Sequence, residues 1–281
     1  MRLLRTTKGI ARQREDEILE LLDLPHSDIA ALLGDGIETV RDAAVIDEVS
    51  LASATVLAPL RRPGKIVIAG GNYLDHVKEA GLQTPTQVPF VVASGDIVIG
   101  PDEAIILPDE APDLVDYEGE VGLVISKAGS HIPAERALEY VGGLTIVNDV
   151  TARDVQLQGL AHGTISDLSY IVRSKQFPTF KPVGPAVVTI DEFDNPLDLR
   201  ITTTVNGQIR QDSRTSQMIF GIPQIIETVS ASVDLAVGDL VLTGTPAGVA
   251  LAVGGYLRAG DSVAVTVERL GVLVNTVARA S

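Results

Sequence analysis

Short runs of valine, isoleucine and threonine, each interrupted by glycine or proline, dominate this chain of 281 residues. β-Branched residues favour extended backbone, and the interruptions favour strands joined by turns over long helices. Asn206–Gly207, between ITTTV and QIRQ, is typical of a hairpin turn. Because regular helices do not separate the runs, we predict an α+β, mostly β fold and disfavour a doubly wound sheet. The predicted strands are Lys65–Gly70, Gly119–Ser126, Gly143–Asp149, Ala186–Ile190, Leu199–Val205, Asp239–Thr243 and Ser262–Glu268.

Helical patterns are shorter, and most of the helical signal lies ahead of Pro59 and Pro63. Proline punctuates the ends of elements, so we predict a small N-terminal region at residues 1–60 and a mainly β catalytic domain at residues 61–281. The predicted helices are Ile10–Leu22, Asp28–Leu33, Asn72–Ala80, Glu135–Tyr140 and Pro223–Val229.

The composition limits the chemistry that the chain can perform. It contains no cysteine, so a metal site must use oxygen or imidazole ligands, and a cysteine nucleophile is excluded. The 37 acidic and 22 basic residues give a formal net charge of −15, which disfavours nucleic acid and anionic membranes as partners. No apolar run reaches the roughly 18 residues of a membrane span, and the first residues show no secretory signal. We expect a cytoplasmic protein.

The segment Asp116-Tyr117-Glu118-Gly119-Glu120 is the most informative one for function. Alternate side chains on a strand share a face, so Glu118 and Glu120 are expected to point the same way, with Asp116 also on that side. Crowded carboxylates are tolerated where solvent covers them or where a hard cation such as Mg²⁺ or Mn²⁺ binds between them. On this fragment alone, a metal site and the exposed face of an edge strand both remain open.

A second acidic position follows an apolar strand that ends in Asn148-Asp149. Asp149 at a strand end is well placed to be a third carboxylate ligand. Arg153 and Gln156, a few residues later, could face an anionic or carbonyl substrate. The alternative is that Asn148 and Asp149 only cap the next turn.

His76 and Glu79 are three residues apart in a predicted helix, so their side chains are neighbours. A carboxylate beside an imidazole raises its basicity and orients it, which suits a general base acting on water. The alternative is a solvated helix face with an incidental contact. Tyr73, in the same motif, is expected to contact the substrate.

Two loops offer further polar groups. Lys175, in the proline- and aromatic-rich stretch SKQFPTFKPVGP, could neutralise a substrate carboxylate. The loop LTGTPAGV, which contains Thr245, could offer backbone N–H groups and a hydroxyl to an oxyanion. A simple β-turn is the alternative for the second loop.

Taken in order, the motifs NYxxHxxE, DYExE, NDVTARDxQ, SKxF, GP, VNG and GDLVLTGTPAGV resemble the fumarylacetoacetate hydrolase superfamily over roughly residues 60–281. The resemblance implies a mixed β-sandwich roll, usually found as a homodimer, and a lid helix that carries the His–Glu pair. It also implies Mg²⁺ or Mn²⁺ as the cofactor. The residues that match the family's metal ligands are Glu118, Glu120 and Asp149, those that match its catalytic groups are His76, Glu79 and Lys175, and those that match groups around its substrate are Tyr73, Arg153, Gln156 and Thr245.

This resemblance leads us to expect a metal-dependent hydrolase that cleaves a C–C bond in a small acylpyruvate-like 2-oxo or 1,3-dicarbonyl acid through an enolate held at the metal. The alternatives are an isomerase, hydratase or decarboxylase of a 2-oxo acid in aromatic or sugar-acid catabolism, or a non-catalytic binding protein on the same fold. A zinc hydrolase is disfavoured, because the chain has only four histidines and no His-x-x-x-His spacing.

Two positions depart from the family pattern. Ala93 lies about where members often have lysine, and Pro178 lies where many have aspartate. The first change removes a positive charge near the expected site, so we expect a less anionic or differently held substrate. His162, in a variable stretch, is expected to be a solvent-facing loop residue.

Overall fold

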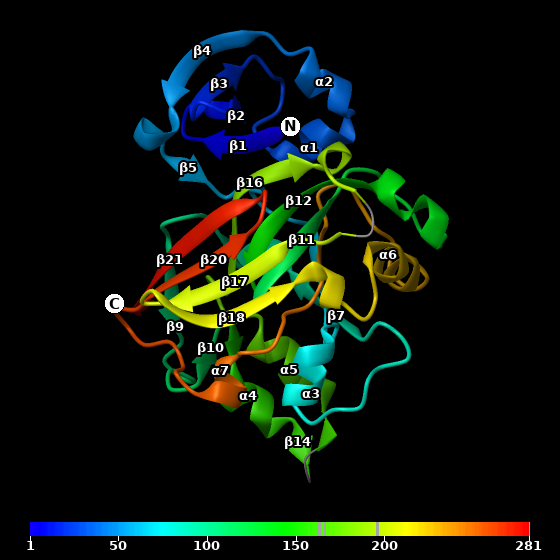
Figure 1. Ribbon diagram of the computed structural model, residues 1–281, viewed down its shortest axis with the longest axis vertical. Helices are drawn as coiled ribbons and strands as arrows, with labels where there is room; N and C mark the ends of the chain where they lie inside the picture. Colours follow the sequence, from blue (N-terminus) through cyan, green and yellow to red (C-terminus); the bar gives the residue numbers. More distant parts are fainter. Residues whose placement is uncertain (162–163, 166, 195–196, 281) are drawn as a thin grey trace.

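The computed structural model describes residues 1–161, 164–165, 167–194 and 197–280. A 12-stranded sheet and a five-stranded sheet build the fold (Figure 1). The path of the larger sheet runs through β4 (Val45–Ser50), β3 (Ile18–Leu22), β2 (Gly9–Gln13), β1 (Arg2–Thr6), β16 (Lys181–Thr189), β12 (Val141–Asn148), β11 (Gly119–Ile125), β19 (Leu240–Leu242), β6 (Lys65–Ala69) and β7 (Phe90–Ser94), with β5 (Val56–Leu57) paired to β1 and β8 (Val98–Ile99) paired to β16.

The remaining strands form the second sheet and two short ribbons. The smaller sheet has the order β18 (Gln208–Arg214), β17 (Arg200–Val205), β20 (Ser262–Val267), β21 (Gly271–Arg279) and β9 (Ala104–Leu107). The ribbons are β10 (Val115–Asp116) with β13 (Thr151–Ala152), and β14 (Leu160–Ala161) with β15 (Thr164–Ile165).

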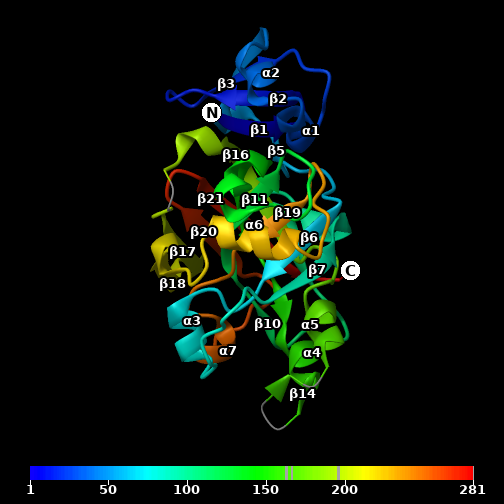
Figure 2. The same cartoon turned by 90° about the vertical axis from the view of Figure 1, so that its right-hand side faces the viewer.

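Helices are short and lie around the sheets. The α-helices are α1 (Ile29–Gly34), α2 (Ile37–Arg41), α3 (Leu74–Glu79), α4 (Arg153–Gln158), α5 (Leu168–Ser174), α6 (Ile222–Ser230) and α7 (Ala250–Val253). 3₁₀ helices cover Leu51–Ser53, Gly95–Ile97, Ala134–Tyr140, Ile190–Glu192 and Thr215–Gln217. Figures 1 and 2 both place α3 and α7 in the half of the molecule away from β1–β4. None of the helices formed by the described residues has the length and apolar character needed to span a bilayer.

β11 lies at the centre of the core because both of its faces are covered. Val121 and Leu123 pack in the apolar cluster that includes Ile201 and Val265 of the smaller sheet. Val124, on the other face, packs in a cluster that includes residues of β1 and α1. A strand that is buried on both faces has a continuous run of apolar residues in its sequence, as VGLVI has. This burial fixes the position of the polar residues at the start of the strand.

Most of the predicted elements are confirmed, with shifts of a few residues at their ends. All seven predicted strands are present, and β16 begins five residues before the predicted strand, at Lys181. Asn206 and Gly207 both have positive φ, as a hairpin turn between β17 and β18 requires. The helix after Asp28 is present, and the Asp28 side chain accepts from the backbone N–H of Ala30. The predicted helix Glu135–Tyr140 is a 3₁₀ helix.

The predicted helix Ile10–Leu22 is wrong. This segment forms the hairpin of β2 and β3, with Glu17 in the left-handed region of its turn. β2 pairs with β1 and β3 pairs with β4, so long-range pairing outweighs a weak helical pattern. The first 60 residues are therefore richer in strand than in helix, and they continue the large sheet through the β1–β16 pair. The domain boundary at residue 60 stays a prediction.

Gly143→Ala tests the packing of β12 against β16. A Cβ atom at this position would lie 2.6 Å from the backbone oxygen of Val188, which is fixed by the sheet. We expect the free energy of unfolding to fall by about 1–3 kcal/mol, measured by urea unfolding. Gly70→Ala is the matched control, because a Cβ there meets nothing within 4 Å. Equal stability of the two variants would contradict the described packing.

Candidate metal centre

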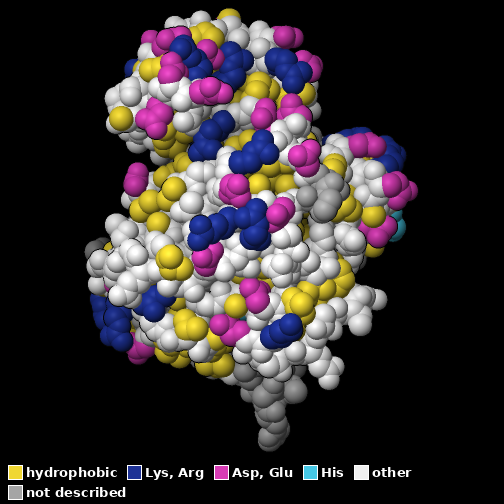
Figure 3. Space-filling view, viewed as in Figure 1, with side chains coloured by type: hydrophobic (Ala, Val, Ile, Leu, Met, Phe, Trp, Pro, Cys, Tyr) yellow, Lys and Arg dark blue, Asp and Glu magenta, His cyan; other side chains and the backbone are white. Residues whose placement is uncertain are grey.

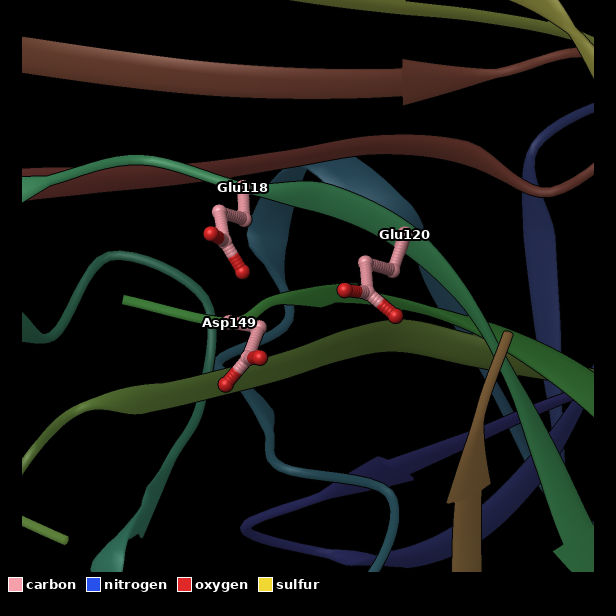
Figure 4. A group of neighbouring side chains, drawn as sticks. All are labelled: Glu118, Glu120 and Asp149. Carbon is pink, nitrogen blue, oxygen red and sulfur yellow. The ribbon is translucent and has the colours of Figure 1, made fainter. Parts of the chain in front are cut away.

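Three buried carboxylates meet where β11 begins and β12 ends. The two strands are antiparallel, with Gly119 opposite Asn148, so Glu118 and Glu120 lie beside Asp149 at one edge. One oxygen from each carboxylate lies within 4.8 Å of the other two. Figure 4 shows the three side chains pointing toward one another. The arrangement could hold a metal ion, and the assignment of these three residues as its ligands stays a prediction.

Asn148 joins the two strands instead of capping the turn that follows. Its Oδ1 accepts from the backbone N–H of Glu118 at 2.9 Å, and the N–H of Asp149 donates to the Glu118 carbonyl at 2.8 Å. Two carboxylates that are 31 positions apart in the sequence are therefore held in register by backbone contacts.

Glu118 is neutralised by two cations. Lys175 Nζ donates to its Oε2 at 2.7 Å, and Arg153 Nη2 donates to its Oε1 at 2.5 Å. Burial would raise the pKa of Glu118, but Lys175 and Arg153 hold it well below the usual range of a glutamate. Glu118 is therefore an anion at every physiological pH.

Glu120 lacks such a counter-ion. Burial and repulsion from Asp149 and Glu118 raise its pKa well above the usual value of a glutamate, and Lys175 and a hydrogen bond from the Gly244 N–H (2.6 Å) oppose the rise only in part. A buried carboxylate that is short of positive charge is a natural ligand for a divalent cation.

Asp149 lies between two lysines. Lys175 Nζ donates to its Oδ2 at 2.5 Å and to Thr151 Oγ1 at 2.9 Å. Lys181 Nζ lies 2.8 Å from its Oδ1, at ion-pair distance. Within the described part of the chain, Oδ1 has no hydrogen-bond partner of good geometry. This oxygen without a well-directed hydrogen bond, the uncompensated Glu120 and the all-oxygen donor set fit a hard cation such as Mg²⁺ or Mn²⁺.

Lys181 was not anticipated from the sequence. It is the first residue of β16, its side chain is completely buried, and its ammonium also donates to the carbonyls of Lys175 and Phe180. Burial lowers its pKa, and Asp149 opposes that shift. The sequence feature that could have indicated a buried, functional Lys181 is a lysine at the start of the otherwise apolar strand KPVGPAVV.

All three guanidinium nitrogens of Arg153 donate hydrogen bonds to other side chains of the protein. Nε donates to Asp116 Oδ2 at 2.8 Å and Nη1 donates to Gln156 Oε1 at 2.7 Å, in addition to the contact with Glu118. Asp116 also accepts from the N–H groups of Ala250 and Leu251 at the start of α7. Asp116 therefore orients Arg153 and lies outside the carboxylate triad. A substrate contact for Arg153 or Gln156 stays a prediction.

The predicted His–Glu pair lies on α3, but its two side chains are not hydrogen-bonded. His76 Nδ1 lies 3.7 Å from Glu79 Oε2, and both oxygens of Glu79 accept from the Gly248 N–H at 3.0 Å. Among the described residues, His76 Nδ1 has no hydrogen-bond partner. His76 is close enough to Glu118 to help lower the pKa of that carboxyl.

Asn72 fixes the start of helix α3. Its side chain donates to the carbonyls of Thr243 and Phe220 and accepts from the Phe220 N–H. Next to it, Tyr73 is fully buried, and its hydroxyl has no partner within the described ranges. Burial, followed by the charges of Glu120 and Asp75, raises its pKa, so Tyr73 is a neutral phenol.

Thr245 braces the strand that carries the two glutamates. Its hydroxyl donates to the Gly119 carbonyl at 3.0 Å and accepts from Gln211 Nε2 at 2.8 Å. Gln211 also donates to the Pro246 carbonyl and accepts from the Gly119 N–H. Gln211 was missed from the sequence, although a buried polar residue in the exposed strand β18 marks it in the structure.

The departures from the family pattern have simple structural settings. Ala93 is buried in an apolar cluster on β7, and Pro178 lies in a turn. His162 is outside the described residues. Figure 3 shows Lys and Arg interspersed with Asp and Glu over the face drawn there. Buried positive charge lies inside, on Lys175, Arg153 and Lys181.

Glu120→Gln tests the uncompensated carboxylate. Without metal, the raised pKa of Glu120 gives stability that is complete below the unfolded-state pKa of about 4.3 and is lost as the pH rises through the folded-state value. At mildly alkaline pH we expect the metal-free variant to unfold at a higher temperature than the wild type. We also expect Mn²⁺ affinity to fall about 100-fold or more, and with it the Mn²⁺-induced rise in Tm. The control is Glu139→Gln, an exposed glutamate paired with Arg136. An equal Mn²⁺ effect on all three proteins would exclude Glu120 as a ligand.

Comparison with known proteins agrees with this geometry. Residues 65–278 match the family described as fumarylacetoacetate (FAA) hydrolase, C-terminal. The chain is 39% identical over 237 residues to "Oxaloacetate tautomerase Fahd2a, mitochondrial" of Rattus norvegicus, covering 84% of this chain and 73% of that protein. A solved 2-hydroxyhepta-2,4-diene-1,7-dioate isomerase from Mycobacterium marinum superposes with a TM-score of 0.79 at 32% identity, covering 100% of this chain and 99% of that one.

A third protein adds a bound ion. The maleylpyruvate hydrolase from Sphingobium sp. SYK-6, solved in complex with manganese(II) and pyruvate, superposes with a TM-score of 0.80 at 25% identity, and each chain is covered completely. The expected roll is confirmed by these whole-chain superpositions. By sequence, by fold and by the order of its motifs, the chain belongs to the fumarylacetoacetate hydrolase family.

Proposed function

We propose that this protein is a divalent-metal-dependent enzyme that moves a proton within a small 2-oxo acid, interconverting its keto and enol forms or shifting an enol double bond. The observation that carries the proposal is the state of the lid pair. His76 Nδ1 is unpaired among the described residues, while Glu79 is bonded to Gly248. Tautomerisation and isomerisation need a single proton-transfer group and no activated water. The names of the rat relative and of the isomerase from Mycobacterium marinum support the same class of reaction.

Glu118, Glu120 and Asp149 would hold the Mg²⁺ or Mn²⁺ ion. When bound, such an ion supplies a Lewis acid that stabilises negative charge developing on the substrate oxygens. A small-molecule 2-oxo acid fits this site, because its adjacent carboxylate and carbonyl oxygens are hard donors like those of the protein.

His76 would remove the proton from the carbon next to the 2-oxo group and return it after the electrons have shifted. Tyr73, a neutral phenol with an unused donor, would hydrogen-bond a substrate oxygen. Burial opposes the charge of Lys175, but Asp149 and Glu118 raise its pKa above that of a free lysine. Lys175 is therefore a fixed positive charge for the substrate carboxylate, and it cannot act as a base. Arg153, Gln156 and Thr245 would support this arrangement.

Hydrolysis of a C–C bond in an acylpyruvate-like acid is the second candidate. A small rotation would close the 3.7 Å gap between His76 and Glu79 and would form the pair that activates water. The similarity to maleylpyruvate hydrolase favours this candidate. Hydration and decarboxylation would use the same carboxylate set. A homodimer, tested by sedimentation, remains part of the proposal.

Metal-stripped protein, with Mg²⁺ or Mn²⁺ added back, separates these reactions. The substrates are the enol form of oxaloacetate, a 2-hydroxy-dienoate and acetylpyruvate, and enol absorbance and products are followed. We expect metal-dependent ketonisation or isomerisation without release of acetate from acetylpyruvate. Metal-dependent release of pyruvate and acetate alone would assign the hydrolase. Tight metal binding without turnover of any substrate would point to a binding protein.

His76→Gln should lower kcat/KM for enol ketonisation by about 10²- to 10³-fold, because the proton-transfer group is removed. Mn²⁺ affinity should stay unchanged, because His76 is not a ligand. His26→Gln, which removes an exposed histidine paired with Asp35 in the N-terminal region, is the matched control. Unchanged turnover in His76→Gln would remove this histidine from the reaction.

Glu79→Gln distinguishes the two candidate reactions. If His76 alone transfers the proton, Glu79→Gln should lower kcat for ketonisation by less than about tenfold. If a His–Glu pair activates water, the variant should lower kcat for hydrolysis by about 100-fold. Steady-state rates with oxaloacetate enol and with acetylpyruvate give the two values. A loss of about 100-fold in ketonisation itself would show that Glu79 takes part in proton transfer.

A further inference from the structure

Lys181 is a lysine with no access to solvent. Its Nζ lies 2.8 Å from Asp149 Oδ1, and it donates to the carbonyls of Lys175 at 2.7 Å and Phe180 at 3.1 Å. A carboxylate oxygen at ion-pair distance and two accepting carbonyls surround the nitrogen, and a set made only of oxygen acceptors favours an ammonium. Lys181 therefore places a cationic side chain in the interior next to a proposed metal ligand.

The charge of Lys181 decides whether the net charge of the metal-loaded site is zero or positive. Counted with every carboxylate ionised, as metal binding requires of Glu120, four buried carboxylates (Asp116, Glu118, Glu120 and Asp149) and three buried cations (Arg153, Lys175 and Lys181) sum to one net negative charge. A divalent ion turns this into one net positive charge. Without Lys181 the loaded site would be neutral, and it would attract an anionic substrate less strongly.

Lys181 and Lys175 contact different oxygens of Asp149. Lys181 contacts Oδ1 of Asp149, and its backbone is fixed because β16 pairs with β12 and, at Lys181 itself, with Val98 of β8. Lys175 contacts Oδ2 from the end of α5 and keeps a small exposed fraction of 6%. Asp149 thus keeps a cation even when Lys175 turns toward a substrate. The lysine missing at position 93 does not leave the site short of positive charge.

We propose that Lys181 is a positioning residue that sets the charge of this site, strengthening the binding of an anionic 2-oxo acid at the expense of affinity for the metal. This inference rests on the metal site and the anionic substrate of the proposed function. It does not depend on which proton-transfer or hydrolytic reaction follows.

Lys181→Met tests the inference by two binding measurements. Calorimetry gives the affinity for Mn²⁺, and a second titration gives the affinity of the Mn²⁺-loaded protein for oxalate, a dianion with the carboxylate and adjacent oxygen of a 2-oxo acid. We expect Mn²⁺ to bind up to about tenfold more tightly than in the wild type, and oxalate to bind about tenfold more weakly. Opposite changes are the signature of a charge effect, because a purely structural role weakens both or neither.

Lys65→Met is the matched control. Its Nζ lies 2.7 Å from the buried carboxylate of Asp239, so the variant breaks a comparable ion pair outside the carboxylate triad. Both affinities should stay at wild-type values. Lys181→Gln is the second variant, because its amide still donates to the two backbone carbonyls while the charge is lost, and it should repeat the opposite changes.

Three results would overturn the inference: unchanged oxalate affinity, loss of both affinities together, or failure of both Lys181 variants to fold while Lys65→Met folds. Wild-type protein that binds no Mn²⁺ would overturn the metal site and the inference together. Wild-type protein that binds Mn²⁺ and oxalate but turns over no substrate would overturn only the proposed function.

Discussion

The buried ion network around Glu118 is the constraint on which the rest of the site depends. Charges removed from water are costly unless each finds a partner at short range, and here Lys175 and Arg153 share Glu118 between them. The partners come from segments far apart in the sequence: the start of β11, the start of α4 and the end of α5. The network can form only when these strands and helices are already in place, so an intact site requires the folded protein.

Within this network the charges are distributed unevenly. Glu118 has two cations and Asp149 has two lysines, whereas Glu120 has a backbone N–H and a share of Lys175. One more protein cation beside Glu120 would satisfy it and would remove any need for a metal. The fold instead leaves Glu120 without a counter-ion of its own beside Asp149. A divalent ion bound by the proposed ligands would supply the missing positive charge.

The parts of this site that follow from local geometry could be predicted from the sequence. Strand period placed Glu118 and Glu120 on one face and Asp149 at a strand end, and the resemblance to the family joined the three into one ligand set. Lys181 and Gln211 were missed because their partners are distant: Gln211 contacts Gly119, 92 positions away. The same cause explains the wrong helix at Ile10–Leu22, where pairing with other strands decides the structure. The Glu79 carboxylate bonds Gly248 rather than His76, which no spacing rule predicts.

The loop around Gly248 couples α3 to the ion network. Its N–H binds Glu79 of α3, and its carbonyl accepts from the hydroxyl of Tyr117. Only glycine fits there, because φ is +101° and a Cβ would lie 2.0 Å from the Arg210 carbonyl. Two residues later the same loop donates to Asp116, the partner of Arg153. One loop therefore bonds both α3, which carries His76, and the network around Glu118, so the proposed proton-transfer group and the proposed metal ligands are positioned as a unit.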